Sequence, residues 1–120
     1  AYIERAIELR PKDPRLRHLK GRFCFEIACL TWIERKCAAL FFAEPPVSSF
    51  DLALEEFFEA EKLHPKGSVD NLLQIARCYI HKHDHRSARK YLLEAQTVHP
   101  STPEDATAAT EVAVMMRKFG

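Results

Sequence analysis

The chain has 120 residues, of which 18 are basic and 17 acidic, so its formal net charge at pH 7 is +1. This length supports one domain with a modest core, and the charge balance argues against a general nucleic-acid binder. No uninterrupted apolar run approaches the roughly 20 residues that a membrane-spanning helix needs. The chain starts inside a predicted helix without an initiator methionine, so we expect it to be part of a longer protein.

Prolines punctuate the chain, and between them apolar residues recur at helical spacing, which predicts six helices. The first helix is expected at 1–9 and the second, unusually long, at about 14–43. The second has a broad apolar face made of Leu16, Leu19, Phe23, Ile27, Leu30, Ile33 and Leu40. Further helices are expected from Ser48 or Ser49 to Leu63, at about 68–82, at about 85–98 and at about 102–118.

The last predicted helix has a cap and a start signal of its own. Thr102 can cap it, and Pro103 suits its first turn because proline lacks the N–H that would be unpaired there. One face of this helix is rich in Ala and Val. It comprises Ala106, Ala109, Val112, Ala113 and Met116. We expect this face to cover the end of the helical stack.

Several residues recur 35 positions later in the chain. Ala53, Phe57, Ala60 and Pro65 return as Ala88, Leu92, Ala95 and Pro100, and Ile3, Ala6 and Pro11 repeat part of the spacing. Small residues let paired helices approach, a bulky residue fills the gap, and proline ends the helix. A period of this length is typical of helical repeat proteins, which usually bind other molecules.

The repeat resembles the tetratricopeptide repeat. Signature positions of its first helix are taken by Leu72, Ile75, Ala76 and Tyr79. The expected fold is therefore all-α, a tetratricopeptide-like array with one lengthened helix and a C-terminal capping helix. Within a single domain we expect a repeat end at 1–11, a repeat with about 20 inserted residues at 14–65, a regular repeat at 69–100 and the cap at 102–118.

The repeat that contains the inserted residues shows a more specific resemblance, to a single protein family. The sequence GRFCFE at 21–26, LTWIERK at 30–36 and Glu44-Pro45-Pro46 are similar to the regulator of microtubule dynamics family. This resemblance implies a cytoplasmic protein associated with microtubules and spindle poles, with a role in microtubule dynamics and chromosome segregation. It also leaves phospholipid as an alternative partner, because one branch of the family is linked to phospholipid binding.

A tetratricopeptide arrangement would place the first helix of each repeat along a concave groove. The predicted binding residues there are Arg15, His18, Arg22, Gln74, Arg77 and His81. Guanidinium groups grip carboxylates with paired hydrogen bonds, so such a groove suits an acidic segment, either a tubulin tail or a peptide of another protein. The alternative is that the arginines are solvated or pair with Glu26 and Asp70.

Charged residues are also separated by sign along the chain. Residues 81–90 carry four Lys or Arg against one Asp, residues 12–22 carry five against one, and residues 51–62 carry five acidic side chains against one Lys. Basic segments of this kind can steer an acidic polymer toward the chain. Ordinary solvated helix faces explain them equally well.

Neither cofactor, metal site nor catalytic residue is predicted. His81, His83 and His85 lie near Cys78, but residues two apart do not share a helix face, and a turn explains the cluster. These histidines could raise affinity for an acidic partner below pH 7. The four cysteines form no CxxC pair and are expected to be reduced thiols. The aromatic residues Trp32, Phe41 and Phe42 are expected to pack on the next helix, with a lipid pocket as the alternative.

Overall fold

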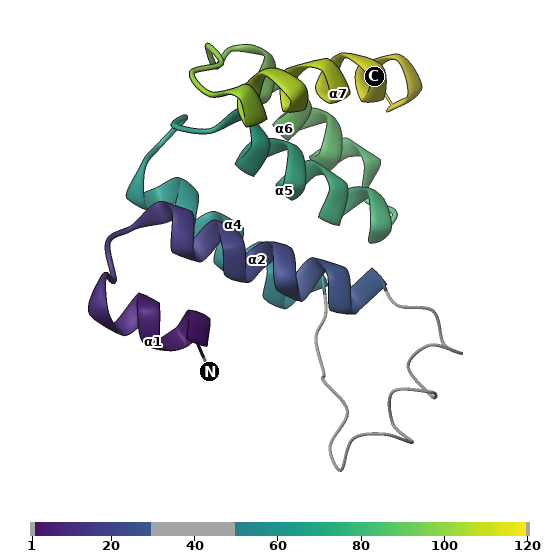
Figure 1. Ribbon diagram of the computed structural model, residues 1–120. Coiled ribbons are helices and arrows are strands. Elements are labelled where there is room, and N and C mark those ends of the chain that lie inside the picture. The colour runs from purple at the N-terminus through teal and green to yellow at the C-terminus, as the bar shows by residue number, and fades with distance from the viewer. Residues whose placement is uncertain (1, 30–49, 120) are drawn as a thin grey trace.

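The computed structural model describes residues 2–29 and 50–119, and its described residues form helices and connecting turns with no strand. The helices are α1 (Tyr2–Leu9), α2 (Pro14–Cys29), α4 (Phe50–Leu63), α5 (Val69–His81), α6 (His85–Gln96) and α7 (Pro103–Phe119) (Figure 1). The predicted all-α class is confirmed. The tetratricopeptide assignment itself stays a prediction. The expected extension of the second helix to residue 43 lies outside the described residues. The same holds for Cys37 and for the predicted packing of Trp32, Phe41 and Phe42.

Side chains at the predicted boundaries cap the helices. Ser68 accepts a hydrogen bond from the Asn71 backbone N–H at the start of α5, at 3.2 Å. Asp84 accepts one from the Ser87 backbone N–H at 3.1 Å and so caps α6. At the start of α7 the Thr102 hydroxyl accepts from the Asp105 backbone N–H at 3.1 Å, as the cap prediction required. Each cap satisfies a backbone donor that a helix leaves unpaired at its N-terminus.

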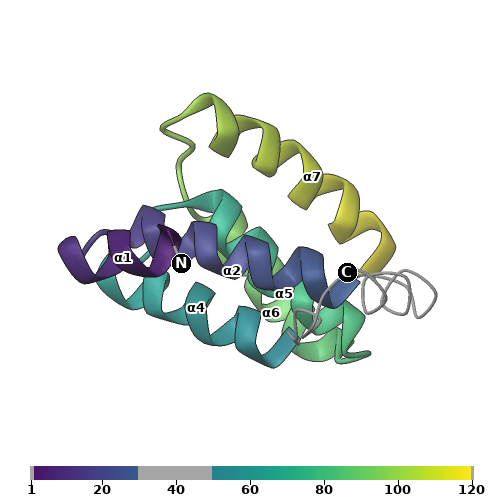
Figure 2. The same cartoon turned by 60° about the horizontal axis from the view of Figure 1, so that its bottom comes forward.

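The helices pack mainly as neighbours in the sequence. Helix α2 runs antiparallel to α4, α5 runs antiparallel to α6, and α4 packs on α5 to join the two pairs (Figures 1 and 2). Helix α7 contacts both α5 and α6 and covers that end, while α1 contacts α2 at the other end. Helices α2 and α5 also touch directly, and this contact positions the candidate site.

The repeated positions found in the sequence form the core. Ala53, Phe57, Ala88 and Leu92 are all fully buried, and their partners at the same spacing, Ala60 and Ala95, are almost so. Close packing at one of these positions depends on Gly21 of α2, where a Cβ atom would lie 2.6 Å from the Phe57 ring. A larger residue at 21 would therefore push α2 away from α4.

Two predicted apolar faces differ from the structure. On α2, Leu19 is 51% exposed and Phe23 is 54% exposed. The buried residues of α2 are instead Gly21, Phe25 and Ala28. Leu16 and Ile27 of the predicted face are partly buried. The prediction was wrong for Leu19 and Phe23 because hydrophobicity alone does not show that Gly21 and Ala28 let α2 approach its neighbours closely. On α7 the buried positions are Asp105, Ala108 and Val112, so of the predicted face only Val112 is fully buried, while Ala106 and Ala113 are exposed.

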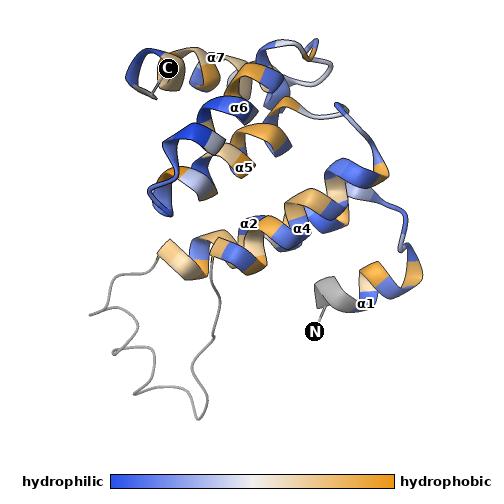
Figure 3. Cartoon of the chain, turned by 180° about the vertical axis from the view of Figure 1, so that it is seen from behind, coloured by the Kyte–Doolittle hydropathy of each residue, from blue (hydrophilic) through white to orange (hydrophobic). Residues whose placement is uncertain are grey.

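In the part of the chain that the structure describes, none of the helices is both long and apolar enough to cross a bilayer. Seen from behind, the first part of α6 and the turn that precedes it consist of hydrophilic residues (Figure 3).

Candidate functional site

The six predicted binding residues lie on α2 and α5, the two helices that the repeat pattern predicted to line the groove. Arg15, His18 and Arg22 belong to α2, and Gln74, Arg77 and His81 belong to α5. They do not form a single basic cluster. Three of them gather around Asp70, two lie near Phe25, and Arg15 stands apart. We call the surface that carries Arg22, Asp70, Arg77 and His81 the α2–α5 face.

Asp70, at the N-terminal end of α5, is the centre of the first group. His18 Nε2 lies 3.0 Å from Asp70 Oδ2, and the Arg22 Nη1 atom lies 3.7 Å from the same oxygen. The Gln74 amide donates to Asp70 Oδ1 at 3.2 Å, and Gln74 is only 4% exposed. The ion pair between Arg22 and Asp70 is the pairing that the alternative interpretation of the arginines anticipated.

These contacts control the charge of Asp70. Burial raises its pKa, but hydrogen bonds from His18 and Gln74 and the charges of His18 and Arg22 lower it by more. The net effect is a pKa below the ordinary value of 3.8. Asp70 is therefore ionised at neutral pH and offsets part of the positive charge expected on this face.

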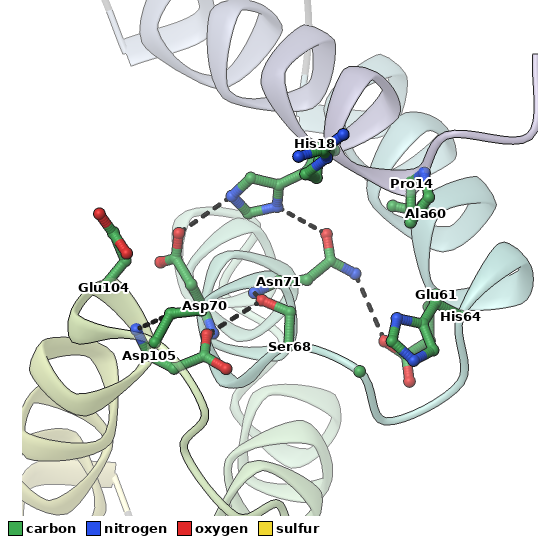
Figure 4. A pocket seen from close by; sticks show the side chains of 13 residues that line it. Pro14, His18, Ala60, Glu61, His64, Ser68, Asp70, Asn71, Glu104 and Asp105 are labelled. Atoms are coloured by element: carbon green, nitrogen blue, oxygen red, sulfur yellow. Dashed lines mark hydrogen bonds and ion pairs between the residues drawn. The ribbon is translucent and has the colours of Figure 1, made fainter. Parts of the chain in front are cut away.

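Asn71 is a member of the group that sequence reasoning missed. His18 Nδ1 lies 2.8 Å from Asn71 Oδ1 (Figure 4). The Asn71 amide nitrogen donates to the Phe57 backbone carbonyl at 2.9 Å. Asn71 is 3% exposed. Its position beside a cap in the α5 sequence gave no signal, because its partners lie 14 and 53 residues away in the chain.

The second group is aromatic and lies at the C-terminal end of α5. The Arg77 guanidinium carbon lies 5.2 Å from the centre of the Phe25 ring. His81 stacks on Phe50 with ring centres 4.8 Å apart, and it packs edge-to-face with Phe25 with ring centres 5.3 Å apart. Burial lowers the pKa of His81, and the positive charge of Arg77 and the neighbouring His83 lower it further. His81 thus needs a more acidic solution than an ordinary histidine to become a cation.

Arg15 points into solvent. Its guanidinium pairs with Asp13 at 3.1 Å, and its side chain is 82% exposed. It also borders a pocket of about 410 Å³ between the first turns of α2, the α4–α5 turn and the starts of α5 and α7. Four carboxylates line this pocket. They belong to Glu61, Asp70, Glu104 and Asp105 (Figure 4). This end of the site is therefore acidic, a property that the sequence analysis did not predict.

The predicted basic segments lie in different places. Arg17 and Lys20, from the segment at 12–22, both pair with Glu56 of α4, at 3.1 and 3.4 Å. Lys82 pairs with Asp51 at the start of α4. On α6, Arg86, Arg89 and Lys90 are exposed, and within the described ranges no carboxylate pairs with them. The α6 cations thus belong to a surface separate from the α2–α5 face.

The thiols and histidines of the described residues show no metal-binding arrangement. Nowhere in 2–29 or 50–119 do three or more His, Cys, Asp or Glu side chains gather closely enough to hold an ion. Cys24, Cys29 and Cys78 are free thiols. Burial raises the pKa of Cys78 to about 12, with the nearby Cys29 thiol contributing to the shift.

Comparison with known proteins identifies the family. The model of the family described as regulator of microtubule dynamics protein 1-3 matches residues 1–120. Regulator of microtubule dynamics protein 2 of Rattus norvegicus is 40% identical over 111 residues, which cover 92% of this chain and 27% of the relative. Regulator of microtubule dynamics protein 1 of Homo sapiens is 36% identical over 118 residues, covering 98% of this chain and 38% of the relative.

The human protein 2 is also 36% identical, over 115 residues, and the match covers 28% of its length. The chain thus spans roughly a quarter to two fifths of the curated relatives that it matches. The resemblance inferred from GRFCFE and LTWIERK is confirmed, and this chain belongs to the regulator of microtubule dynamics family.

Proposed function

We propose that this chain is a non-catalytic binding module that associates with microtubules, and that the α2–α5 face contacts the acidic tails of tubulin. The observation that carries the proposal is the family match over residues 1–120, because the matched relatives are named for regulating microtubule dynamics. A place at the cytoskeleton and a role in chromosome segregation follow as part of the same proposal.

Two arginines supply the contact. Arg22 is 49% exposed, and its distance of 3.7 Å to Asp70 leaves guanidinium donors for a second carboxylate. Arg77 lies on Phe25, and among the described residues no carboxylate forms an ion pair with it. A guanidinium held over a ring without an ion-pair partner keeps donors available for another acceptor.

The charges on the α2–α5 face indicate where along α5 the acidic segment would bind. Carboxylates that line the pocket repel an acidic chain at the N-terminal end of α5, and Arg22 offsets one of them, Asp70. Toward the C-terminal end of α5, Arg77 attracts an acidic chain, whereas Lys82 already pairs with Asp51. We therefore place the acidic tail along the C-terminal half of α5 and the adjoining part of α2. Exposed ion pairs of this kind contribute about 0.5–1 kcal/mol each and weaken with salt.

Co-sedimentation with stabilised microtubules, intact or stripped of their acidic tails, tests the proposal. The double variant Arg22→Gln and Arg77→Gln should weaken binding about tenfold, since two contacts together contribute roughly 1.4 kcal/mol. The control is Arg86→Gln with Lys90→Gln, which removes the same charge from α6. Circular dichroism would verify that both variants keep their helices.

Binding that depends on both the tails and the α2–α5 arginines would support the proposal. Equal weakening by the α6 control would show that net charge, rather than the α2–α5 face, determines affinity. Tail-independent binding would place the contact on the body of tubulin, and absence of binding would contradict a microtubule site in this part of the protein.

A further inference from the structure

We propose that His18 is a pH-responsive clasp between α2 and α5, in which the doubly protonated imidazole ring holds the two helices together and loss of one proton releases one of the two bonds. Its ring bridges two acceptors on consecutive residues of α5, Asp70 and Asn71 (Figure 4). The inference follows from which atoms can donate and which can only accept.

The orientation of Asn71 fixes the role of its oxygen. Its amide nitrogen donates to the Phe57 carbonyl at 2.9 Å, and the same nitrogen lies 3.4 Å from Glu61 Oε2. Because both of these partners are acceptors, a flipped amide would turn an oxygen toward two other oxygens. The oxygen Oδ1 must therefore face His18 Nδ1, and a bond there requires a proton on Nδ1.

The other ring nitrogen faces a second acceptor. Asp70 Oδ2 lies 3.0 Å from His18 Nε2, and an ionised carboxylate cannot donate. Both ring nitrogens consequently donate in this arrangement, which only the imidazolium form can do. In either neutral tautomer one nitrogen lone pair would face an oxygen at hydrogen-bond distance, and that bond would become a repulsion.

Groups from every neighbouring element bear on this ring. The Phe57 ring of α4 lies 5.4 Å from it, and Arg22 of α2 shares Asp70 with it. Asp105 of α7 accepts from the Asp70 backbone N–H at 3.3 Å. The remaining charged or titratable groups around the adjoining pocket are Arg15, Glu61, His64 and Glu104.

The His18 clasp affects the placement of α2 on α5 because α2 packs much less extensively on α5 than on α4. The two His18 bonds fix α2 against α5 at the N-terminal end of α5, together with the ion pair between Arg22 and Asp70. When the ring loses a proton, Arg22 becomes the remaining positive partner of Asp70, and the spacing between Arg22 and Arg77 is free to change. Histidine is suited to this role because its charge changes between about pH 5 and pH 8.

Nuclear magnetic resonance of the 15N-labelled chain between pH 5.5 and 8 tests the clasp directly. The expected result is that loss of the His18 ring proton is accompanied by shifts of the Asn71 side-chain amide and of the backbone amides at 70–74, all with one midpoint. The exposed His99 serves as the internal control, since its titration should leave these amides unchanged. Titration of His18 without those shifts, or a neutral ring at pH 5.5, would overturn the proposal.

A stability measurement gives a second readout. The ratio of the folding equilibrium constants at pH 6 and pH 8 should be about tenfold larger in the unmodified chain than in His18→Gln, because glutamine cannot change its charge. His99→Gln should keep the full ratio. An unchanged ratio in His18→Gln would also overturn the clasp, and the resonance experiment decides the matter if that variant does not fold.

Discussion

Replacement of Gly21 by alanine tests the closest helix contact of this chain. A Cβ atom at 21 would lie 2.6 Å from Phe57 Cε1, 2.7 Å from Cδ1 and 3.0 Å from Cζ. The Phe57 ring is fully buried, so it has no free space into which it can turn. Overpacking of this kind costs about 1–3 kcal/mol, whereas alanine gains about 1 kcal/mol over glycine inside a helix. We expect Gly21→Ala to lower the free energy of unfolding by roughly 1 kcal/mol.

Chemical denaturation with Gly67→Ala as control measures this effect. A Cβ atom at 67 would come closer still to its neighbour, 2.3 Å from His64 Nδ1, but His64 is exposed and can rotate away. The control should therefore change stability by less than about 0.5 kcal/mol. If the Cβ distance alone determined the loss of stability, Gly67→Ala would be the more destabilising variant. The comparison therefore distinguishes a steric clash with a buried ring from a clash with an exposed side chain.

The double variant Gly21→Ala with Phe57→Leu completes the test. A smaller side chain at 57 makes room for the new methyl group, so the loss caused by Gly21→Ala should nearly disappear in that background. A coupling of about 1 kcal/mol between the two sites is expected, because residues in direct contact do not act additively. If Gly21→Ala stabilises the chain by the full helix-propensity gain, the packing of α2 on α4 described above is refuted.

Three further results are expected. Leu92→Ala should lower the free energy of unfolding by about 3 kcal/mol and Leu93→Ala by less than about 0.5 kcal/mol, since Leu92 is fully buried while Leu93 is 46% exposed; equal losses in urea denaturation would contradict this. Cys78, buried with its pKa raised to about 12, should resist iodoacetamide at pH 8 in the folded chain and react after unfolding, as followed by mass spectrometry. Because the folded pKa of Asp70 is lowered from 3.8, its carboxylate stabilises the fold above that value and loses this effect as pH falls through the folded pKa; Asp70→Asn should therefore cost roughly 1–3 kcal/mol at pH 6 and progressively less in acid, and a constant cost would count against the ion pairs.

Local signals in the sequence determined the helices of this chain and their caps. The 35-residue recurrence of Ala53, Phe57 and Ala60 predicted which positions of α4 and α6 are buried. It could do so because small residues at this spacing let paired helices approach and a bulky residue fills the gap between them. Thr102 with Pro103, and the prolines that follow α1, α4 and α6, set boundaries through backbone chemistry that needs no distant partner. The family resemblance likewise depended on short runs of residues.

Tertiary structure alone decided the charge of the candidate site. The sequence placed Arg22, His18 and Gln74 on a groove, but only the packing of α2 on α5 showed that all three meet Asp70. The acidic pocket arises in the same way, since Glu61 and Asp105 come from helices far apart in the chain. Helical periodicity fixes which residues share a face of one helix, whereas the partner across an interface depends on the angle and depth of packing, which small residues such as Gly21 set.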